Sequence, residues 1–233
     1  MKKSELDNET SGFLLIDKPS DWTSHDVVAS LKGISKIKKV GHAGTLDPMA
    51  TGLLVCGLGK GTKALGNFSA LPKTYLATIT LGQTSDSYDA TGEITKTSQE
   101  TDFEKYLPAV KSWLKNLIGP QQQIPPMYSA KSINGTRLYK LARKGEEVER
   151  EPVAITIYDT ELLNWQNSGL VELKVTCSAG TYIRSLAHDL GQFLGCGGLL
   201  SALRRTEIGD FRVENAIIWP DQKSDWREHL LPL

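Results

Sequence analysis

The 233-residue sequence predicts an α+β fold with a mixed, largely antiparallel sheet. Residues 75–81 and 171–177 alternate apolar and polar side chains, which is the pattern of a half-buried strand, and residues 153–158 add a further strand. Residues 102–117 and 182–194 carry apolar side chains at helical spacing and predict two packed helices. Because strands and helices follow one another without regular alternation, a parallel α/β sheet is not expected.

The elements near the N-terminus are predicted from local signals. The apolar run at 12–16 predicts a strand that ends at Pro19. A helix is expected to follow, capped by Thr23 or Ser24. Further along the chain, the Gln-rich and Pro-rich residues 121–126 are expected to break regular structure.

The composition, with 39% hydrophobic and 23% charged residues, is typical of one globular domain, expected at 12–233. Residues 1–11 lack the apolar core of a signal peptide and predict a flexible tail. No run of about 18 apolar residues occurs, so no transmembrane helix is expected. The three cysteines form no C-x-x-C pair, and the four histidines lack metal-ligand spacing. This usage fits a reducing cytoplasm and predicts neither disulfides nor a metal site.

Positive charge is concentrated in one segment, although the net charge of the chain is zero. Between Leu31 and Lys73, a single acid, Asp47, accompanies seven lysines. A lysine-rich segment is often just a solvated surface, but here it brackets a candidate catalytic loop, where it could hold phosphates. The lysines are Lys32, Lys36, Lys38, Lys39, Lys60, Lys63 and Lys73.

The most informative segment is residues 41–54, Gly-His-Ala-Gly-Thr-Leu-Asp-Pro-Met-Ala-Thr-Gly-Leu-Leu. Gly41 and Gly44 permit backbone dihedrals that other residues resist. Pro48 disfavours the α-helical region at Asp47, because its Cδ would clash with the preceding residue. Asp47 is therefore expected on a constrained loop, which suits an acid that must meet a substrate at fixed geometry. An ordinary turn is the alternative for Asp-Pro between glycines.

This run resembles, without interruption, the active-site motif of the TruB family of tRNA pseudouridine synthases. The resemblance extends from about Gly12 to Phe211 and implies the pseudouridine synthase fold, a bent mixed sheet with flanking helices and a central RNA-binding cleft. It implies an isomerase that flips a uridine out of RNA, breaks its N1–C1′ bond and joins C5 to C1′. Asp47 is the implied catalytic carboxylate. The reaction has no net oxidation or hydrolysis, so no cofactor and no metal are expected.

Arg184 lies near the start of the predicted helix at 182–194. A buried guanidinium needs a carboxylate partner, and by sequence alone Arg184 could pair with Asp189, with Asp47 or with nothing. The segment Gly-Thr-Tyr-Ile-Arg-Ser-Leu resembles the TruB motif whose arginine pairs with the catalytic aspartate. The resemblance therefore implies that Arg184 keeps Asp47 ionised and correctly oriented.

Three further residues match the lining of the family's base pocket. Tyr75, in a Lys-x-Tyr element, is implied to stack on the target base as part of the catalytic set. Tyr182 resembles a second aromatic residue of the pocket, and Leu203 resembles its apolar wall. Ordinary core packing is the alternative for Tyr75 and Leu203.

Three basic or aromatic residues are expected to support substrate binding. Lys18, followed by Pro19, resembles the family's first motif, which supports the catalytic loop. His42 is implied to fill the space that the flipped base vacates, and a capping or core histidine is the alternative. Lys73 opens the Lys-x-Tyr element and belongs to the lysine-rich segment.

Residues 120–150 resemble the segment that in TruB enzymes leads into a mobile RNA-clamping insertion. Lys131 and Arg137 are its candidate RNA-binding residues. Four acids dilute its positive charge, so phosphate binding is expected to be uneven: Glu146, Glu147, Glu149 and Glu151.

Several residues resemble the stand-alone bacterial form of the family rather than its guide-RNA-dependent relatives: Ala43, Met49, Ala50, Leu53 and Leu54. This implies uridine 55 in the T loop of tRNA as the substrate, with no guide RNA. Many TruB enzymes carry a C-terminal PUA domain, and that domain is expected to be absent here. We expect a cytoplasmic monomer that binds the T arm of tRNA and no membrane.

Two other functions remain open from the sequence. One is a non-catalytic RNA-binding or RNA-folding module on the same scaffold. The other is a carboxylate-dependent nucleoside glycosidase, which would need a second carboxylate such as Asp86 or Asp89. The product discriminates these alternatives, because a glycosidase releases the free base and an isomerase retains it.

Overall fold

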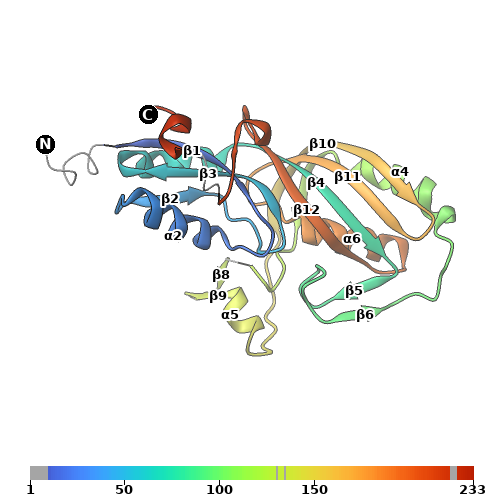
Figure 1. Cartoon of the computed structure of the whole chain (residues 1–233). Helices are drawn as coiled ribbons and strands as arrows, with labels where there is room; N and C mark the ends of the chain where they lie inside the picture. The colour runs from blue at the N-terminus through green and yellow to red at the C-terminus, as the bar shows by residue number, and fades with distance from the viewer. Residues whose placement is uncertain (1–9, 130, 134, 221–224) are drawn as a thin grey trace, which may run out of the picture. The chain divides into compact units, whose positions relative to one another are not determined.

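The computed structural model describes residues 10–129, 131–133, 135–220 and 225–233. The chain forms two compact units: Met1–Tyr75 with Leu203–Leu233, and Leu76–Ala202. Two strands, β4 (Lys73–Leu81) and β12 (Gly198–Ile208), contribute residues to both units (Figure 1). Residues 1–9 of the predicted tail, and Ala130 and Asn134 of the predicted insertion, lie outside the described residues.

The first unit is a sheet with strand order β14-β1-β3-β12, in which β2 pairs with β3 and β13 with β12. The pairings of β1 with β3, β2 with β3 and β12 with β13 are antiparallel, whereas β14 with β1 and β12 with β3 are parallel. Its elements are β1 (Gly12–Lys18), α2 (Ser24–Ser35), β2 (Val40–Ala43), β3 (Thr51–Leu58), η1 (Gly59–Ala64), α3 (Leu65–Ala70), β13 (Phe211–Arg212), η3 (Val213–Asn215), β14 (Ile217–Ile218) and η4 (Trp226–His229).

Strand β1 is buried on both faces and joins two apolar cores. Leu14 and Ile16 pack in a cluster with side chains of α2, including Val27 and Leu31. Residues on the opposite face of β1, among them Phe13, pack in a second cluster that includes Phe68 of α3. Because successive strand residues point to opposite faces, an unbroken apolar run is the pattern of such a strand. The strand ends at Lys18, before Pro19, as predicted.

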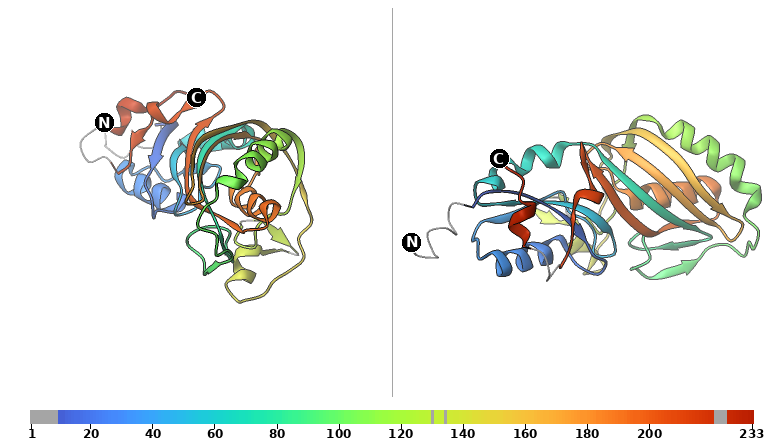
Figure 2. Two further views of the ribbon diagram at one scale, coloured as in Figure 1. Left: turned by 90° about the vertical axis from the view of Figure 1, so that its right-hand side faces the viewer. Right: turned by 45° about the horizontal axis from the view of Figure 1, so that its top comes forward.

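The second unit contains a sheet with order β12-β4-β11-β10-β7, and α4 and α6 lie on the same face of it (Figure 2). The pairings of β10 with β11 and with β7 are antiparallel. Its other elements are β5 (Gln83–Ser85), β6 (Ile94–Lys96), η2 (Glu104–Tyr106), α4 (Leu107–Leu117), β7 (Gly119–Gln123), β8 (Ser132–Ile133), β9 (Thr136–Arg137), α5 (Leu138–Ala142), β10 (Val153–Gln166), β11 (Leu170–Cys177) and α6 (Ile183–Leu194). The predicted α+β class with a mixed, largely antiparallel sheet is confirmed.

Strand β10 continues eight residues beyond the predicted end at Tyr158. Its register with β11 shifts between Ile157 and Asp159 and again between Leu162 and Asn164. Such bulges insert an extra residue and reverse the alternation of side chains. The alternation of apolar and polar residues is therefore interrupted in the sequence, although β10 continues without a break.

The predicted helix at 102–117 begins later than expected, at Leu107, after the short 3-10 helix η2. Pro108 explains the difference, because proline lacks an N–H and is tolerated only in the first turn of a helix. The side chain of Asp102, predicted as a possible helix cap, instead accepts a hydrogen bond at 3.0 Å from the amide of Glu104, the first residue of η2.

Two local predictions were wrong in part. Of the predicted break at 121–126, residues 124–126 lie outside any helix or strand, but Gln121, Gln122 and Gln123 belong to β7, paired with residues 153–155 of β10. Sheet pairing overrides weak intrinsic strand propensity here. The helical spacing of apolar side chains at 182–194 also predicts that Phe193 packs inward, but Phe193, in the last turn of α6, is 57% exposed.

All three cysteines, Cys56, Cys177 and Cys196, are free and buried. Burial raises the pKa of the Cys56 thiol to about 12, so it is not a reactive thiolate. Within the described parts of the chain, no helix is long and apolar enough to cross a membrane.

We predict that Gly52→Ala destabilises the fold by about 2–4 kcal/mol, measured by urea unfolding. Gly52 has φ +102°, and a Cβ placed there would lie 2.2 Å from the backbone oxygen of Arg205 on β12. Gly33→Ala in α2 is the control, since a Cβ there meets nothing within 4 Å and should stabilise by roughly 0.5–1 kcal/mol. Equal stability of the Gly52→Ala variant and the wild type would contradict the close approach of β3 and β12.

Candidate active site

Asp47 lies in the loop between β2 and β3, hereafter the Asp47 loop (residues 44–50). Gly44 opens the loop with φ +73°, a conformation that side chains with a Cβ rarely adopt. A turn follows, in which the Ala50 amide donates to the carbonyl of Asp47 at 3.1 Å. Leu46 and Ala50 are buried, while Asp47 is half-buried. The apolar neighbours therefore anchor the loop while leaving the carboxylate within reach of solvent or substrate.

The tip of the loop is held by Lys18, the last residue of β1. Its side chain is fully buried, and its ammonium donates to the carbonyl oxygens of Pro48 at 3.1 Å, Pro19 at 2.8 Å and Trp22 at 2.6 Å. The Asp21 amide also donates to the Pro48 carbonyl, at 2.9 Å. Lys18 thus ties the loop to the segment after β1, which is the supporting role that the sequence resemblance implies.

The first residue of α2, Ser24, holds the middle of the loop. Its hydroxyl accepts from the Leu46 amide at 2.9 Å and lies 3.3 Å from the Leu46 carbonyl, to which it donates. Ser24 is fixed in turn because Thr23 and Asp26 form a reciprocal capping box at the start of α2. The sequence predicted a cap at Thr23 or Ser24, and Thr23 is the cap, whereas the contact of Ser24 with the loop was not predicted.

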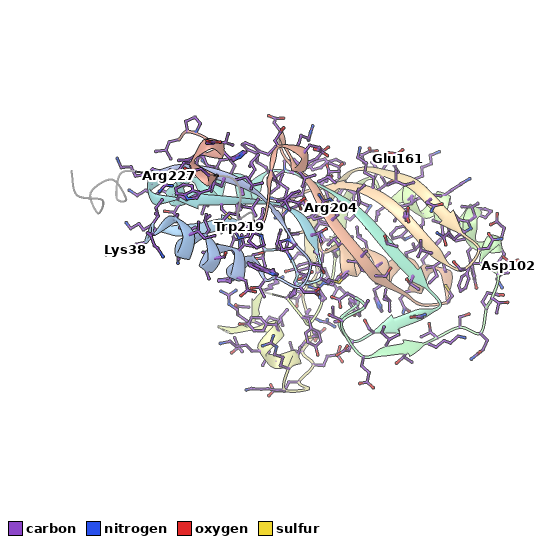
Figure 3. The ribbon with its side chains drawn as sticks, viewed as in Figure 1. Lys38, Asp102, Glu161, Arg204, Trp219 and Arg227 are labelled. Carbon is purple, nitrogen blue, oxygen red and sulfur yellow. The ribbon has the colours of Figure 1, made fainter. Side chains whose placement is uncertain are left out.

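Arg205 of β12 binds the loop near its beginning and the strand just after it. Its guanidinium donates through Nη2 to the carbonyl of Gly44 at 3.0 Å and through Nε to the carbonyl of Leu53 at 2.8 Å. The side chain is only 1% exposed. Arg204, the preceding residue, is labelled in Figure 3. It instead forms a bidentate ion pair with Asp17, at 3.0 and 2.6 Å.

Burial governs the protonation of Lys18. Removal from water lowers the pKa of Lys18 to about 8, against the opposing attraction of Asp21 and Asp47. The ammonium form therefore still prevails at neutral pH, and it supplies the donors for the three carbonyls.

His42, on β2, presents a neutral ring. Burial lowers its pKa to about 4, and the charges of His25 and Arg205 act in the same direction. The His25 ring meets it edge-on, with 5.4 Å between ring centroids. The His42 Nδ1 atom is buried and has no hydrogen-bond partner among the described residues. A neutral imidazole is suited to stacking against a nucleobase, which is the role implied by the sequence.

The other predicted residues of the first unit are largely buried. Tyr75 on β4 is 9% exposed and Leu203 on β12 is 8% exposed. Lys73 is 4% exposed, and its ammonium donates to the carbonyls of Phe68, Ser69 and Leu71 at the end of α3. The exposed lysines of the lysine-rich segment are Lys32, Lys36, Lys38, Lys39, Lys60 and Lys63.

In the second unit, Arg184 is the second residue of α6 and is 4% exposed. Its Nη1 donates to the carbonyl of Ser87 at 3.1 Å, and its Nη2 donates to the carbonyl of Tyr128 at 2.8 Å. Its Nε lies 3.6 Å from Oδ2 of Asp89, which is also buried. These contacts form a socket that fixes the plane of the guanidinium.

Asp89 was not among the partners that the sequence suggested for Arg184. Its Oδ1 accepts from the hydroxyl of Ser87 at 2.7 Å, the amide of Thr91 at 2.9 Å and the hydroxyl of Thr91 at 2.6 Å. The Asp-x-Thr spacing signals this local turn, but it carries no information about an arginine 95 positions later. The pairing of Arg184 with Asp47 remains a prediction.

The residues beside Arg184 are also held by defined contacts. Tyr182 precedes α6, and its amide and carbonyl exchange hydrogen bonds with the Gln123 side chain of β7, at 2.8 and 3.0 Å. Tyr128 donates its hydroxyl to Oδ2 of Asp86 at 2.9 Å. Of the predicted RNA-binding residues of the insertion, Lys131 directly precedes β8 and is half-buried, and Arg137 is the last residue of β9 and is exposed.

The sequence comparisons decide the family. A model of the TruB family pseudouridylate synthase N-terminal domain matches residues 32–183, and a model of the tRNA pseudouridylate synthase B C-terminal domain matches residues 184–232. The chain belongs to the TruB family of pseudouridylate synthases.

Several relatives bear the name tRNA pseudouridine synthase B. One from Opitutus terrae is 46% identical over 209 residues, covering 90% of this chain and 86% of the relative. One from Dehalococcoides mccartyi is 48% identical over 212 residues, covering 90% and 69%. One from Clostridium tetani is 47% identical over 224 residues, covering 95% and 76%.

Two solved structures share the fold of this TruB-family chain. A chain of a Cbf5-Nop10-Gar1 complex is 30% identical with a TM-score of 0.69, covering 94% of this chain and 55% of that one. A chain of an H/ACA RNP bound to a substrate RNA containing 2′-deoxyuridine is 26% identical with a TM-score of 0.68, covering 99% and 62%. This chain therefore spans little more than half of those chains. The predicted pseudouridine synthase fold is confirmed, and the central RNA-binding cleft remains a prediction.

We predict that His42→Gln makes this TruB-family chain less sensitive to acid. The pKa of His42 falls from 6.5 to about 4 on folding, so the unfolded state takes up the proton first. Stability is then full above pH 6.5 and decreases as the pH falls toward 4. Urea midpoints measured between about pH 7 and pH 4 should decrease less in His42→Gln than in the wild type. The exposed His229→Gln should follow the wild type, and an equal acid dependence of all three would refute the burial effect.

Proposed function

We propose that this chain isomerises uridine to pseudouridine at position 55 in the T loop of tRNA. The observation that carries the proposal is Asp47, on a loop anchored at Gly44, Leu46 and Pro48, in a chain of the TruB family. Relatives named tRNA pseudouridine synthase B support tRNA as the substrate.

The target uridine must leave its stack before its C1′ and C5 atoms can react, and extrusion costs a few kcal/mol. In our proposal, Tyr75 stacks on the flipped base and the neutral ring of His42 occupies the vacated space. Tyr182 and Leu203 line the pocket. Base–aromatic stacking contributes about 1–3 kcal/mol, which is comparable with the cost of unstacking.

Asp47 then acts on the extruded nucleotide as nucleophile or as the stabiliser of positive charge at the sugar. The N1–C1′ bond breaks, the uracil turns, and C5 bonds to C1′. The C5 proton passes to water and N1 takes up a proton, so the reaction is balanced without an oxidant or reductant. Arg184, fixed by Asp89, Ser87 and Tyr128, is proposed to orient the Asp47 carboxylate.

The recognition surface is proposed to combine exposed lysines of the first unit with the insertion at 120–150, where Lys131 and Arg137 lie. Phosphate contacts by such residues weaken with salt. We further propose that the chain acts as a cytoplasmic monomer without a guide RNA. Its three free, buried cysteines fit a reducing compartment.

The glycosidase alternative receives no support from the geometry. Asp89 is already bound by Arg184, Ser87 and Thr91, and Asp86 accepts from Tyr128 and from the Glu93 amide. Both carboxylates thus have structural partners. Analysis of the product tests the choice: free uracil would favour a glycosidase, and a retained base an isomerase.

We predict that Asp47→Asn abolishes turnover and leaves the Kd for tRNA within a few-fold of the wild type. The amide keeps the size of the side chain but loses its charge and nucleophilicity. Tritium release from tRNA labelled at C5 of uridine measures the reaction, because formation of the C5–C1′ bond expels that hydrogen. Asp210→Asn, at the exposed turn after β12, is the control and should be fully active. Release by Asp47→Asn at more than a few per cent of the wild-type rate would exclude Asp47 as the catalytic group.

Arg184→Lys and Asp89→Asn should each lower kcat by about 100-fold or more while leaving tRNA affinity nearly unchanged. A lysine keeps the charge but cannot reproduce a planar fork with three fixed donors. The double variant should lose little more than either single variant, because both act through one ion pair. Strictly additive losses would show that Asp89 does not act by positioning Arg184.

A further inference from the structure

Arg205 stands out because its guanidinium is buried and its contacts within the described residues are with backbone carbonyls. Its side chain is 1% exposed, and its hydrogen bonds go to the carbonyls of Gly44 and Leu53. No ion pair of Arg205 occurs in the parts of the chain that the structure describes. Arg204, one position earlier on the same strand, has an ordinary carboxylate partner in Asp17.

Burying a guanidinium without a carboxylate partner lowers the stability of a fold, so the geometry of Arg205 is expected to have another role. Burial of a charge carries a desolvation penalty, and an apolar side chain of similar size often stabilises a fold as well or better. What an apolar residue cannot do is bind two carbonyls at a fixed separation. The two carbonyls that Arg205 binds stand on either side of Asp47 in the sequence, three positions before it and six positions after it.

The backbone of Arg205 makes the arrangement rigid. Arg205 pairs with Gly52 where β12 runs parallel to β3, and there is no room for a Cβ at Gly52. The side chain therefore starts from a fixed point beside β3, just after the Asp47 loop, and reaches the first residue of the loop. Lys18 and Ser24 hold the middle of the same loop.

We propose that Arg205 is a positioning residue for the reaction, which clamps the first residue of the Asp47 loop to the strand that follows the loop and so sets where the carboxylate meets the ribose. The proposal rests on the proposed function for its catalytic consequence. Arg205 does not touch the substrate in this proposal and acts only through the loop. A displacement of about 1 Å at a reacting group can cost about 100-fold in rate, so loss of one of the two contacts should be visible in kcat.

Arg205→Lys is the decisive variant. It keeps the positive charge near Lys18 and His42, but a single ammonium nitrogen replaces the two guanidinium nitrogens that reach Gly44 and Leu53. Arg205→Met removes the charge as well and leaves both carbonyls without this donor, so it reports the contribution to folding. The control is Arg212→Lys in β13, where the side chain is 45% exposed and pairs with Glu207.

Three measurements separate positioning from simple destabilisation. Single-turnover tritium release at saturating tRNA gives the chemical step, and filter binding gives the Kd for tRNA. Thermal unfolding shows whether each variant is folded at the assay temperature. Hydrogen exchange of the Leu46 and Ala50 amides, both bonded within or to the Asp47 loop, reports the order of the loop without reference to activity.

We expect Arg205→Lys to remain folded, to bind tRNA within about threefold of the wild type and to lose about 30- to 100-fold in kcat. The Leu46 and Ala50 amides should exchange faster, while the amides of β1 should not. A kcat within about threefold of the wild type, or a loss explained entirely by the unfolded fraction, would overturn the proposal. If the wild type itself released no tritium, the proposed function would fail, and unchanged exchange in Arg205→Lys would separately refute the clamp.

Discussion

The Asp47 loop must hold a carboxylate at a defined place without belonging to a helix or a strand. Backbone carbonyls in such a loop need donors from elsewhere, and buried groups supply them here. The ammonium of Lys18 and the guanidinium of Arg205 approach the loop from different strands, and the hydroxyl of Ser24 comes from the start of α2. Three elements of the first unit, β1, β12 and α2, therefore also determine the position of its functional carboxylate.

In the second unit, the guanidinium of Arg184 is likewise held in a fixed position. Arg184 lies in the first turn of α6, and its three nitrogens contact two chain segments, one with Ser87 and Asp89 and the other with Tyr128. Asp89 is immobilised by its own turn before it meets the arginine. Two of the three groups that bind Arg184 are backbone carbonyls, those of Ser87 and Tyr128, and they remain when either side chain is substituted.

Local patterns predicted much of the fold. The apolar run of β1, the capping signals of α2 and the alternation in β4 and β11 each depend on neighbouring residues, so the sequence displays them directly. The bulges of β10 and the late start of α4 at Pro108 broke or displaced such patterns. The residues of the candidate site were likewise predictable from local motifs in some cases and not in others. Asp47, Arg184 and Lys18 lie in recognisable motifs, whereas the contacts of Arg205 with Gly44 and of Arg184 with Asp89 join residues far apart in the chain. Only folding brings these together, and no spacing rule predicts them.

The adjacent residues Arg204 and Arg205 restrict where insertions and deletions can occur in β12 of related sequences. Successive strand side chains alternate between faces, so Arg204 reaches Asp17 while Arg205 reaches the Asp47 loop. Insertion or deletion of one residue earlier in β12 would exchange the faces and place each arginine where the other is needed. Length changes should therefore be excluded from this strand during evolution and accumulate instead at the turn after it, around Gly209 and Asp210, where the chain reverses into β13.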